Sequence, residues 1–277
     1  MKSFRLWLSE QADTPKQAMQ SAKEIEIGMI DNKAKKLYQE IIDAISSKKY
    51  QSAISYIDDI AKDPKLKFVL SLGFGGELAD LDLTVEHKSI KVSDLIPTQN
   101  EIGFDETLKY ILLGTNLENC FDDPVVIKKP IVTFNGKYIV DGHHRWSEIY
   151  ISNPNATAEC VNIVGKLQPL DLLKAVQCTI ASNLGHLIIK NVQGKNLLKT
   201  SESELRKYIS NNITDNAKEI LLSKGIKDPI DYLVYNCINM QKNNKPIKNA
   251  PDRGDMPQTS EDPDLFNDLD SGVDDMQ

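Results

Sequence analysis

Hydrophobic residues recur at helical spacing at both ends of the chain, and shorter hydrophobic runs separated by turn residues lie between them. Over Asp31–Ser47 the residues Ala34, Leu37, Tyr38, Ile41, Ile42 and Ile45 fall on one helical face. We therefore expect an α+β protein: a small mixed-sheet domain flanked by N- and C-terminal helical regions. The pattern divides the chain into a helical region (1–65), a connecting segment (66–88), a mixed domain (89–165), a second helical region (166–241) and a tail (242–277).

The middle segment predicts strand, helix, hairpin, helix and strand in about 75 residues, which indicates a compact mixed unit. Asn135-Gly136 is a strong hairpin turn, and Gly114 is a helix end. The expected elements are a strand at Ser89–Val92, a helix at Phe104–Leu113, a strand at Pro130–Phe134, a second strand through Ile139 and Val140, a helix from near His143 to about Ser152 and a strand at Thr157–Val164.

The C-terminal helical region carries clear start signals. Ser201 with Glu204 fits a capping box, and Asp228-Pro229 opens the last predicted helix. Beyond Gln241 hydrophobic residues become rare and Asn, Lys, Pro, Asp and Gly dominate, so we expect disorder over 242–277.

Polar and charged residues cluster at one predicted corner of the mixed domain, between a strand and the following helix. Gly142 permits a sharp turn after the strand, and the helix that begins at His143 points its free N–H groups and positive dipole end outward. With His144 and Arg145 beside these groups, the corner predicts an anion site, and phosphate is the usual occupant of such a helix start.

The same residues also have structural interpretations. Asp141 could cap the helix, or it could bind Mg²⁺, which prefers oxygen ligands and often bridges a carboxylate to phosphates. Thr98 and Gln99 could line a ligand site or form only a polar turn after Pro97. Adjacent histidines at a helix start point apart, so we do not expect a two-histidine metal site.

Charge is unevenly divided along the chain, whose formal net charge is −7. Residues 251–277 hold nine acids and one base, Arg253, which leaves 32 bases and 31 acids in residues 1–250. A neutral body gives no support to binding of duplex DNA through charge. Widely spaced cysteines and the lack of an apolar run of roughly 20 residues favour a reduced, cytoplasmic protein without a membrane partner.

Three ordered pieces of residues 89–165 resemble the ParB/sulfiredoxin superfamily. They are Ile90–Gln99, Pro130-Ile131-Val132, and Tyr138–Trp146, which contains Asp-Gly-His-His-Arg. That corner motif resembles the branch labelled ParB-like nuclease domain, which is similar to the ADP-dependent free-serine kinases. His143 stands where sulfiredoxins have their reactive cysteine, so the resemblance does not extend to sulfiredoxin chemistry. His143-His144 replace the Glu-Arg of the CTP-binding ParB proteins.

The resemblance implies a nucleotide ligand (ATP, ADP or CTP) with Mg²⁺, bound through Gly142, His144 and Arg145 together with Thr98 and Gln99. It implies a phosphotransferase or nucleotide hydrolase in which Glu101 is the general base, Asp141 binds the metal and His143 lies on the substrate side. If the general base of the family corresponds to Gln99 and not to Glu101, the resemblance implies nucleotide binding without catalysis.

Two other functions remain open. One is a ParB-like DNA-binding protein or nuclease. The other is a phage virion or assembly protein that keeps the fold without catalysis, found in the host cytoplasm or the virion with phage structural proteins as partners; the chain's first residues and Asn/Lys/Ile-rich composition suit a phage gene. In the tail, Leu265-Phe266 and Leu269 are a candidate protein-binding motif.

Overall fold

The computed structural model describes residues 84–173, 176–177 and 194–257, together with scattered residues between 40 and 56. It divides into two compact units. The first comprises 1–86, 163–189 and 256–277, and the second comprises 87–162 and 190–255. Most of the predicted N-terminal helical region, part of the predicted helical region 166–241, and residues 258–277 with Leu265-Phe266 and Leu269 lie outside the described residues.

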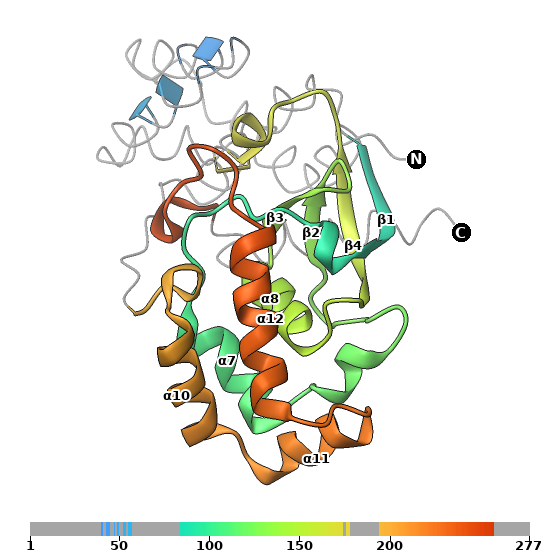
Figure 1. The fold of residues 1–277 in the computed structure, drawn as a ribbon. Helices are drawn as coiled ribbons and strands as arrows, with labels where there is room; N and C mark the ends of the chain where they lie inside the picture. Colours follow the sequence, from blue (N-terminus) through green and yellow to red (C-terminus); the bar gives the residue numbers. More distant parts are fainter. Residues whose placement is uncertain are drawn as a thin grey trace, which may run out of the picture. The chain divides into compact units, whose positions relative to one another are not determined.

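The described strands form one four-stranded sheet in the order β1-β4-β2-β3 (Figure 1). The strands are β1 (Thr84–Lys91), β2 (Ile131–Phe134), β3 (Tyr138–Asp141) and β4 (Thr157–Val164). The mixed α+β class is confirmed, but β1 begins at Thr84, inside the predicted connecting segment. Val85 and Ile90 are both buried but, five residues apart in one strand, lie on opposite faces of the sheet, so the strand is longer than the Ser89–Val92 run suggested.

The β2–β3 pair is the predicted antiparallel hairpin. Asn135 and Gly136 both have positive φ, at 52° and 64°, as the turn between two such strands requires. On the far side of β3, Ile96 forms a parallel bridge with Tyr138. The hairpin and this extra segment bring the Pro97 loop beside the end of β3.

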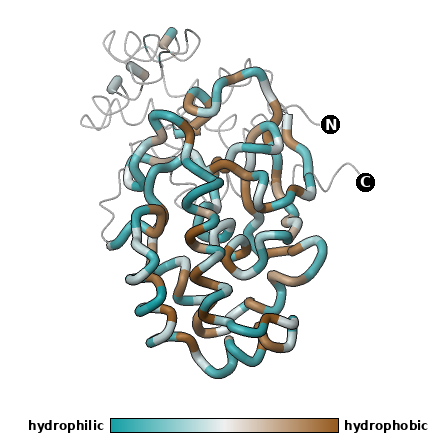
Figure 2. The backbone as a smooth tube through the Cα atoms, in the orientation of Figure 1, coloured by the Kyte–Doolittle hydropathy of each residue, from teal (hydrophilic) through white to brown (hydrophobic). Residues whose placement is uncertain are grey.

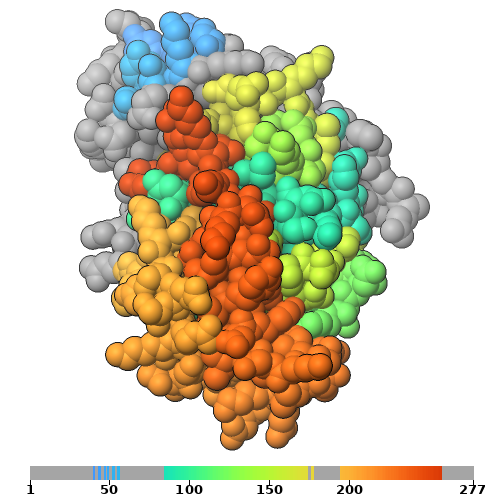
Figure 3. All heavy atoms as spheres, viewed as in Figure 1, coloured from blue at the N-terminus to red at the C-terminus, as the bar shows by residue number. Residues whose placement is uncertain are grey.

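Helices of the second unit pack into one hydrophobic core. They are α7 (Phe104–Leu113), α8 (His143–Ser152), α10 (Glu202–Asn212), α11 (Asp215–Ser223) and α12 (Pro229–Asn243), with 3₁₀ turns η3 (Val92–Asp94), η4 (Glu118–Phe121), η5 (Leu197–Lys199) and η6 (Arg253–Asp255). Helix α8 packs against α7 and α12, and α10 packs against α12. Figure 2 shows hydrophobic residues recurring along α12, and Figure 3 shows the outer side of α12 at the surface beside α10.

The caps confirm the helix starts that the sequence predicts. Ser201 and Glu204 form the complete capping box of α10, and the Asp228 side chain caps α12, which has Pro229 in its first turn. These signals are local, so they fix the helix starts before any tertiary contact forms.

The predicted start of disorder at residue 242 is wrong. Helix α12 continues to Asn243, and the segment Asn244–Asp255, which we call the strap, is described and hydrogen-bonded. The Asn244 side chain donates to the carbonyl oxygens of Ser93 (2.9 Å) and Leu95 (2.8 Å). Polar composition suggested disorder, but the polar side chains here satisfy buried backbone groups.

No helix among the described residues is long and apolar enough to span a membrane.

Candidate functional site

The corner between β3 and α8 has the backbone geometry that the sequence predicts. Gly142 is the N-cap of α8 with φ 90°, in the left-handed region that favours glycine. The first helical hydrogen bond runs from the Trp146 N–H to the Gly142 carbonyl (2.8 Å), so the N–H groups of His143, His144 and Arg145 have no acceptor within the helix. The corner therefore presents a row of backbone donors.

His143 joins this corner to the Pro97 loop. Its ring is buried, and its Nε2 accepts a hydrogen bond from the Thr98 N–H at 3.0 Å. The Thr98 hydroxyl donates to the Ile139 carbonyl. Burial, His144 and Arg145 lower the pKa of His143 to about 3, in agreement with an unprotonated Nε2. Both side chains are thus used within the protein, and their geometry is that of a structural link.

His144 makes a similar bond to the next part of the loop. Its Nε2 accepts from the Gly103 N–H at 3.2 Å. Burial and the nearby Arg253 lower the pKa of His144 to about 4, although Glu106 opposes them. Because the ring is neutral and Nε2 is an acceptor, His144 offers an anion its backbone N–H and the Nδ1–H of the ring rather than a charged imidazolium.

Arg145 supplies the positive charge of the corner. Its Nη2 donates to Asp141 Oδ2 (2.8 Å) and to the Pro130 carbonyl (3.2 Å), and its Nε is buried without a hydrogen-bond partner among the described residues. A Cβ on Gly142 would lie 2.8 Å from Arg145 Nη2, so the glycine also makes room for the guanidinium.

Asp141 does not cap α8, because the helix has no side-chain cap and the carboxylate pairs with Arg145 instead. The capping interpretation of Asp141 is therefore wrong. Among the described residues no three His, Cys, Asp or Glu side chains group as a metal site. A divalent cation at this corner would depend on Asp141 and on phosphate oxygens for its remaining ligands.

Glu101 lies at a neighbouring cavity of about 40 Å³, whose other lining residues are Ile102, Gly103, Gly194, Lys195, Asn196 and Arg253. None of the residues 141–145 line it. Gln99 is buried, and its side-chain amide donates to the Glu101 carbonyl. The structure thus brings together Thr98 with His143 and Asp141 with Arg145, whereas the Glu101 side chain faces the neighbouring cavity rather than these four residues.

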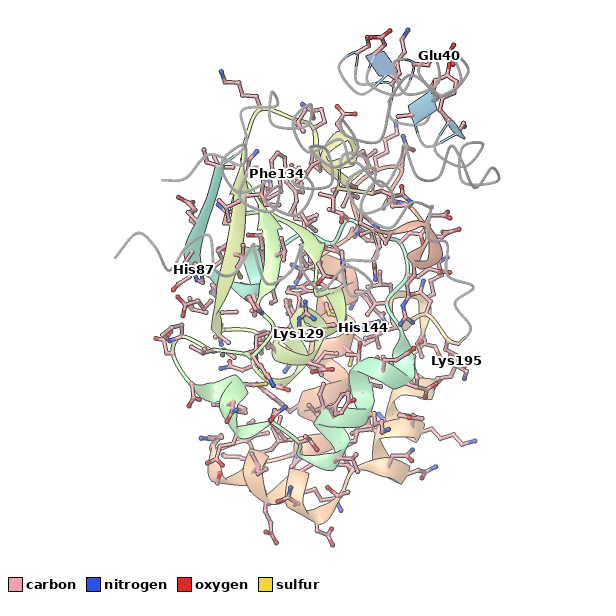
Figure 4. All side chains as sticks on the ribbon, turned by 180° about the vertical axis from the view of Figure 1, so that it is seen from behind. Glu40, His87, Lys129, Phe134, His144 and Lys195 are labelled. Atoms are coloured by element: carbon pink, nitrogen blue, oxygen red, sulfur yellow. The ribbon has the colours of Figure 1, made fainter. Side chains whose placement is uncertain are left out.

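Sequence reasoning missed several charged residues around the corner. Arg253 donates to Glu106 Oε1 at 3.0 Å, and Lys195 lines the cavity; Figure 4 labels Lys195 together with His144. Glu148 lies one turn after Arg145, and burial raises its pKa to about 7 against the opposing effect of Arg145. Only Arg253 carried a sequence signal, as the one base among the acids of residues 251–277.

Comparison of the whole chain with family models, with curated proteins and with solved structures gives no match.

Proposed function

We propose that this chain is a ParB/sulfiredoxin-like protein that binds the phosphates of a nucleotide at the start of α8. One observation carries the proposal. The backbone donors that follow Gly142 lie beside the Arg145 guanidinium, whose buried Nε has no partner among the described residues. A buried guanidinium N–H without an acceptor costs free energy, and a phosphate oxygen can satisfy it. The likeness of Tyr138–Trp146 to the superfamily's phosphate-binding corner supports the same ligand.

Asp141 and Arg145 have different roles in this proposal. Arg145 and the helix start hold phosphate oxygens, and Asp141, which pairs with Arg145, supplies a carboxylate for Mg²⁺. Bound Mg²⁺ would neutralise phosphate charge. Asp141 would then exchange all or part of its bond with Arg145 for the cation, which frees Arg145 Nη2 for phosphate.

Phosphoryl transfer or hydrolysis is the reaction that this ligand suggests. Glu101 is the candidate general base, since a carboxylate near a transferred phosphoryl group can accept the proton of the attacking hydroxyl. The specific observation in its favour is its cavity, which is shared with Gly103, the contact of His144.

Titration calorimetry with ATP, ADP, CTP and GTP, each with and without Mg²⁺, tests the proposal. We expect binding of at least one nucleotide, and a loss of about tenfold or more in Arg145→Ala, as for one charge-assisted hydrogen-bond donor. Arg206→Ala is the matched control, because Arg206 is an exposed arginine of α10 that pairs with Asp231 of α12. Phosphate release by the same samples, with Glu101→Gln for comparison, tests turnover.

Absence of binding by all four nucleotides would overturn the proposal, as would equal affinities of Arg145→Ala and the unmodified protein. Arg145→Ala also loses bonds to Asp141 and Pro130, so its melting temperature must be measured beside that of Arg145→Lys. A folded Arg145→Lys with partial affinity separates loss of the ligand contact from loss of structure.

A further inference from the structure

The strap runs alongside the loop that leads to the candidate site. Ile247 donates its N–H to the Pro97 carbonyl (3.1 Å), and further along the Asn100 N–H donates to the Pro251 carbonyl (3.0 Å). The Asn100 side chain donates to Asp252 Oδ1. The segment after α12 can be followed beside this loop in Figure 1. The two segments therefore run side by side in the same direction. At the end of the strap, η6 contacts the first turn of α7 through Arg253 and Glu106.

Arg253 is the strap residue that lies against Gly103. Its Nη1 lies 3.0 Å from Glu106 Oε1, and a Cβ on Gly103 would come within 2.6 Å of the same nitrogen. Gly103 in turn donates its N–H to His144 Nε2. Gly103 has an ordinary extended backbone, so what excludes a side chain there is space rather than conformation. Arg253 is therefore separated from the helix start by one glycine.

Arg253 also borders open space. The cavity of about 40 Å³ lies between Arg253, Lys195 and Glu101, and 22% of the Arg253 side chain is exposed. The guanidinium has five N–H donors, and the only hydrogen bond that it makes to the described residues is the one to Glu106. Positive charge at this position also contributes, after burial, to the lowered pKa of His144.

We propose that Arg253 is a second phosphate-binding residue of the candidate site, supplied by the strap from outside the ParB-like block. This inference rests on the proposed function. Arg145 borders the start of α8 through Gly142, and Arg253 borders it through Gly103. A ligand with two or more phosphates is bound by both arginines, and Arg253 exchanges its bond with Glu106 for one with a phosphate oxygen. Glu106 holds the guanidinium in place before the ligand arrives.

Substitutions of Arg253 and Glu106 should change nucleotide affinity in opposite directions if Arg253 binds the ligand. The comparison therefore distinguishes a ligand-binding role of Arg253 from a structural one. If Arg253 only held the strap, Arg253→Ala and Glu106→Gln would break the same ion pair and change affinity alike. If Arg253 binds phosphate, Arg253→Ala weakens binding, whereas Glu106→Gln strengthens it, because the variant removes both a competitor for Arg253 and a repelling carboxylate.

The test is calorimetric titration of the full chain with ADP and with inorganic pyrophosphate. We expect Arg253→Ala to lower both affinities about tenfold, Arg253→Lys to recover part of this loss, and Glu106→Gln to raise both affinities about threefold. Arg206→Ala, which removes a remote exposed arginine, should leave them unchanged. Melting temperatures of all variants show whether each one is folded.

The possible results separate this inference from the proposed function. If the unmodified protein binds ADP and loses it in Arg145→Ala, while Arg253→Ala binds normally, only the role of Arg253 is overturned. A parallel loss in Arg253→Ala and Glu106→Gln overturns it too and assigns the pair to structure. If the unmodified protein binds neither ADP nor pyrophosphate, both proposals fail.

Discussion

Two neighbouring histidines at this corner hold the adjoining loop in the same way. Each accepts a backbone N–H at Nε2, His143 from Thr98 and His144 from Gly103. An acceptor nitrogen must be unprotonated, and burial lowers the pKa of both rings below the ordinary 6.5. The corner therefore keeps a fixed loop geometry at neutral pH, and its positive charge comes from Arg145 and the helix start.

This arrangement predicts a pH-dependent stability. Since the folded pKa of His143 is depressed to about 3, the unfolded state binds the proton first. The stability from this group is fully present above the unfolded pKa of about 6.5 and is lost as pH falls below it, by about 1.4 kcal/mol at pH 5.5. We expect His143→Gln, whose amide oxygen can still accept from the buried Thr98 N–H but cannot titrate, to lose about 1.4 kcal/mol less stability than the unmodified protein between pH 7.5 and pH 5.5.

Urea unfolding at pH 7.5 and 5.5 measures this effect as the difference between His143→Gln and the unmodified protein. The difference is the useful quantity because Glu148, with a pKa raised to about 7 by burial, acts in the opposite direction in this pH range and is present in both proteins. Equal losses between the two pH values in both proteins would show that His143 is not a buried neutral acceptor.

At the scale of elements, local signals explain most of what the sequence predicted. Helix α8 begins at His143 and ends at Ser152 as predicted, because Gly142 is a local start signal and Asn153-Pro154 is a local stop signal. The same locality made the row of backbone donors predictable. The directions of the histidine rings were not, since they depend on Thr98 and Gly103, 45 and 41 residues away along the chain.

The strap is held by contacts between residues far apart in the sequence, which local signals do not predict. Its anchor, Asn244, donates to Ser93, 151 positions earlier, and Arg253 pairs with Glu106, 147 positions earlier. Asn, Lys, Pro and Asp in sequence favour disorder when no partner is known, and the partners here are carbonyls exposed by an irregular loop. No pattern within the strap itself encodes those acceptors.

Removal of the anchor should therefore release the strap. Asn244 is buried, and Asn244→Ala leaves the Ser93 and Leu95 carbonyls without their donor, at a cost of about 1–3 kcal/mol. We expect trypsin to cleave this variant faster at Lys248 than it cleaves the unmodified protein. The matched control is Asn243→Ala, since Asn243 is the preceding residue and its exposed side chain bonds only to Asn239. Equal cleavage of the two variants would show that Asn244 does not anchor the strap.

At the scale of the whole molecule, the net charge is negative and repels the proposed ligand, which is an anion. The formal net charge is −7, and residues 258–277 contribute seven acids and no base, so the remaining chain is neutral with 33 bases and 33 acids. A nucleotide approaching the Arg145 corner is thus repelled by the molecule as a whole while it is attracted locally. Such a net field acts over a Debye length and weakens with salt, whereas contacts at the helix start are screened much less.

Truncation after Pro257 separates these two effects. We expect the shortened chain, with a net charge near zero, to bind nucleotide about two- to fivefold more tightly than the full chain at 20 mM NaCl and equally at 300 mM NaCl, where the Debye length falls to about 6 Å. A full-length variant with the seven acids changed to Asn or Gln should match the truncation, because charge rather than length causes the effect. A gain that persists at 300 mM NaCl, or one that appears in the truncation alone, would instead mean that residues 258–277 compete directly for the nucleotide site. Because Arg253 lies before the truncation point, its contribution to binding should be the same in both chains, and the Arg253→Ala loss measured in each provides that check.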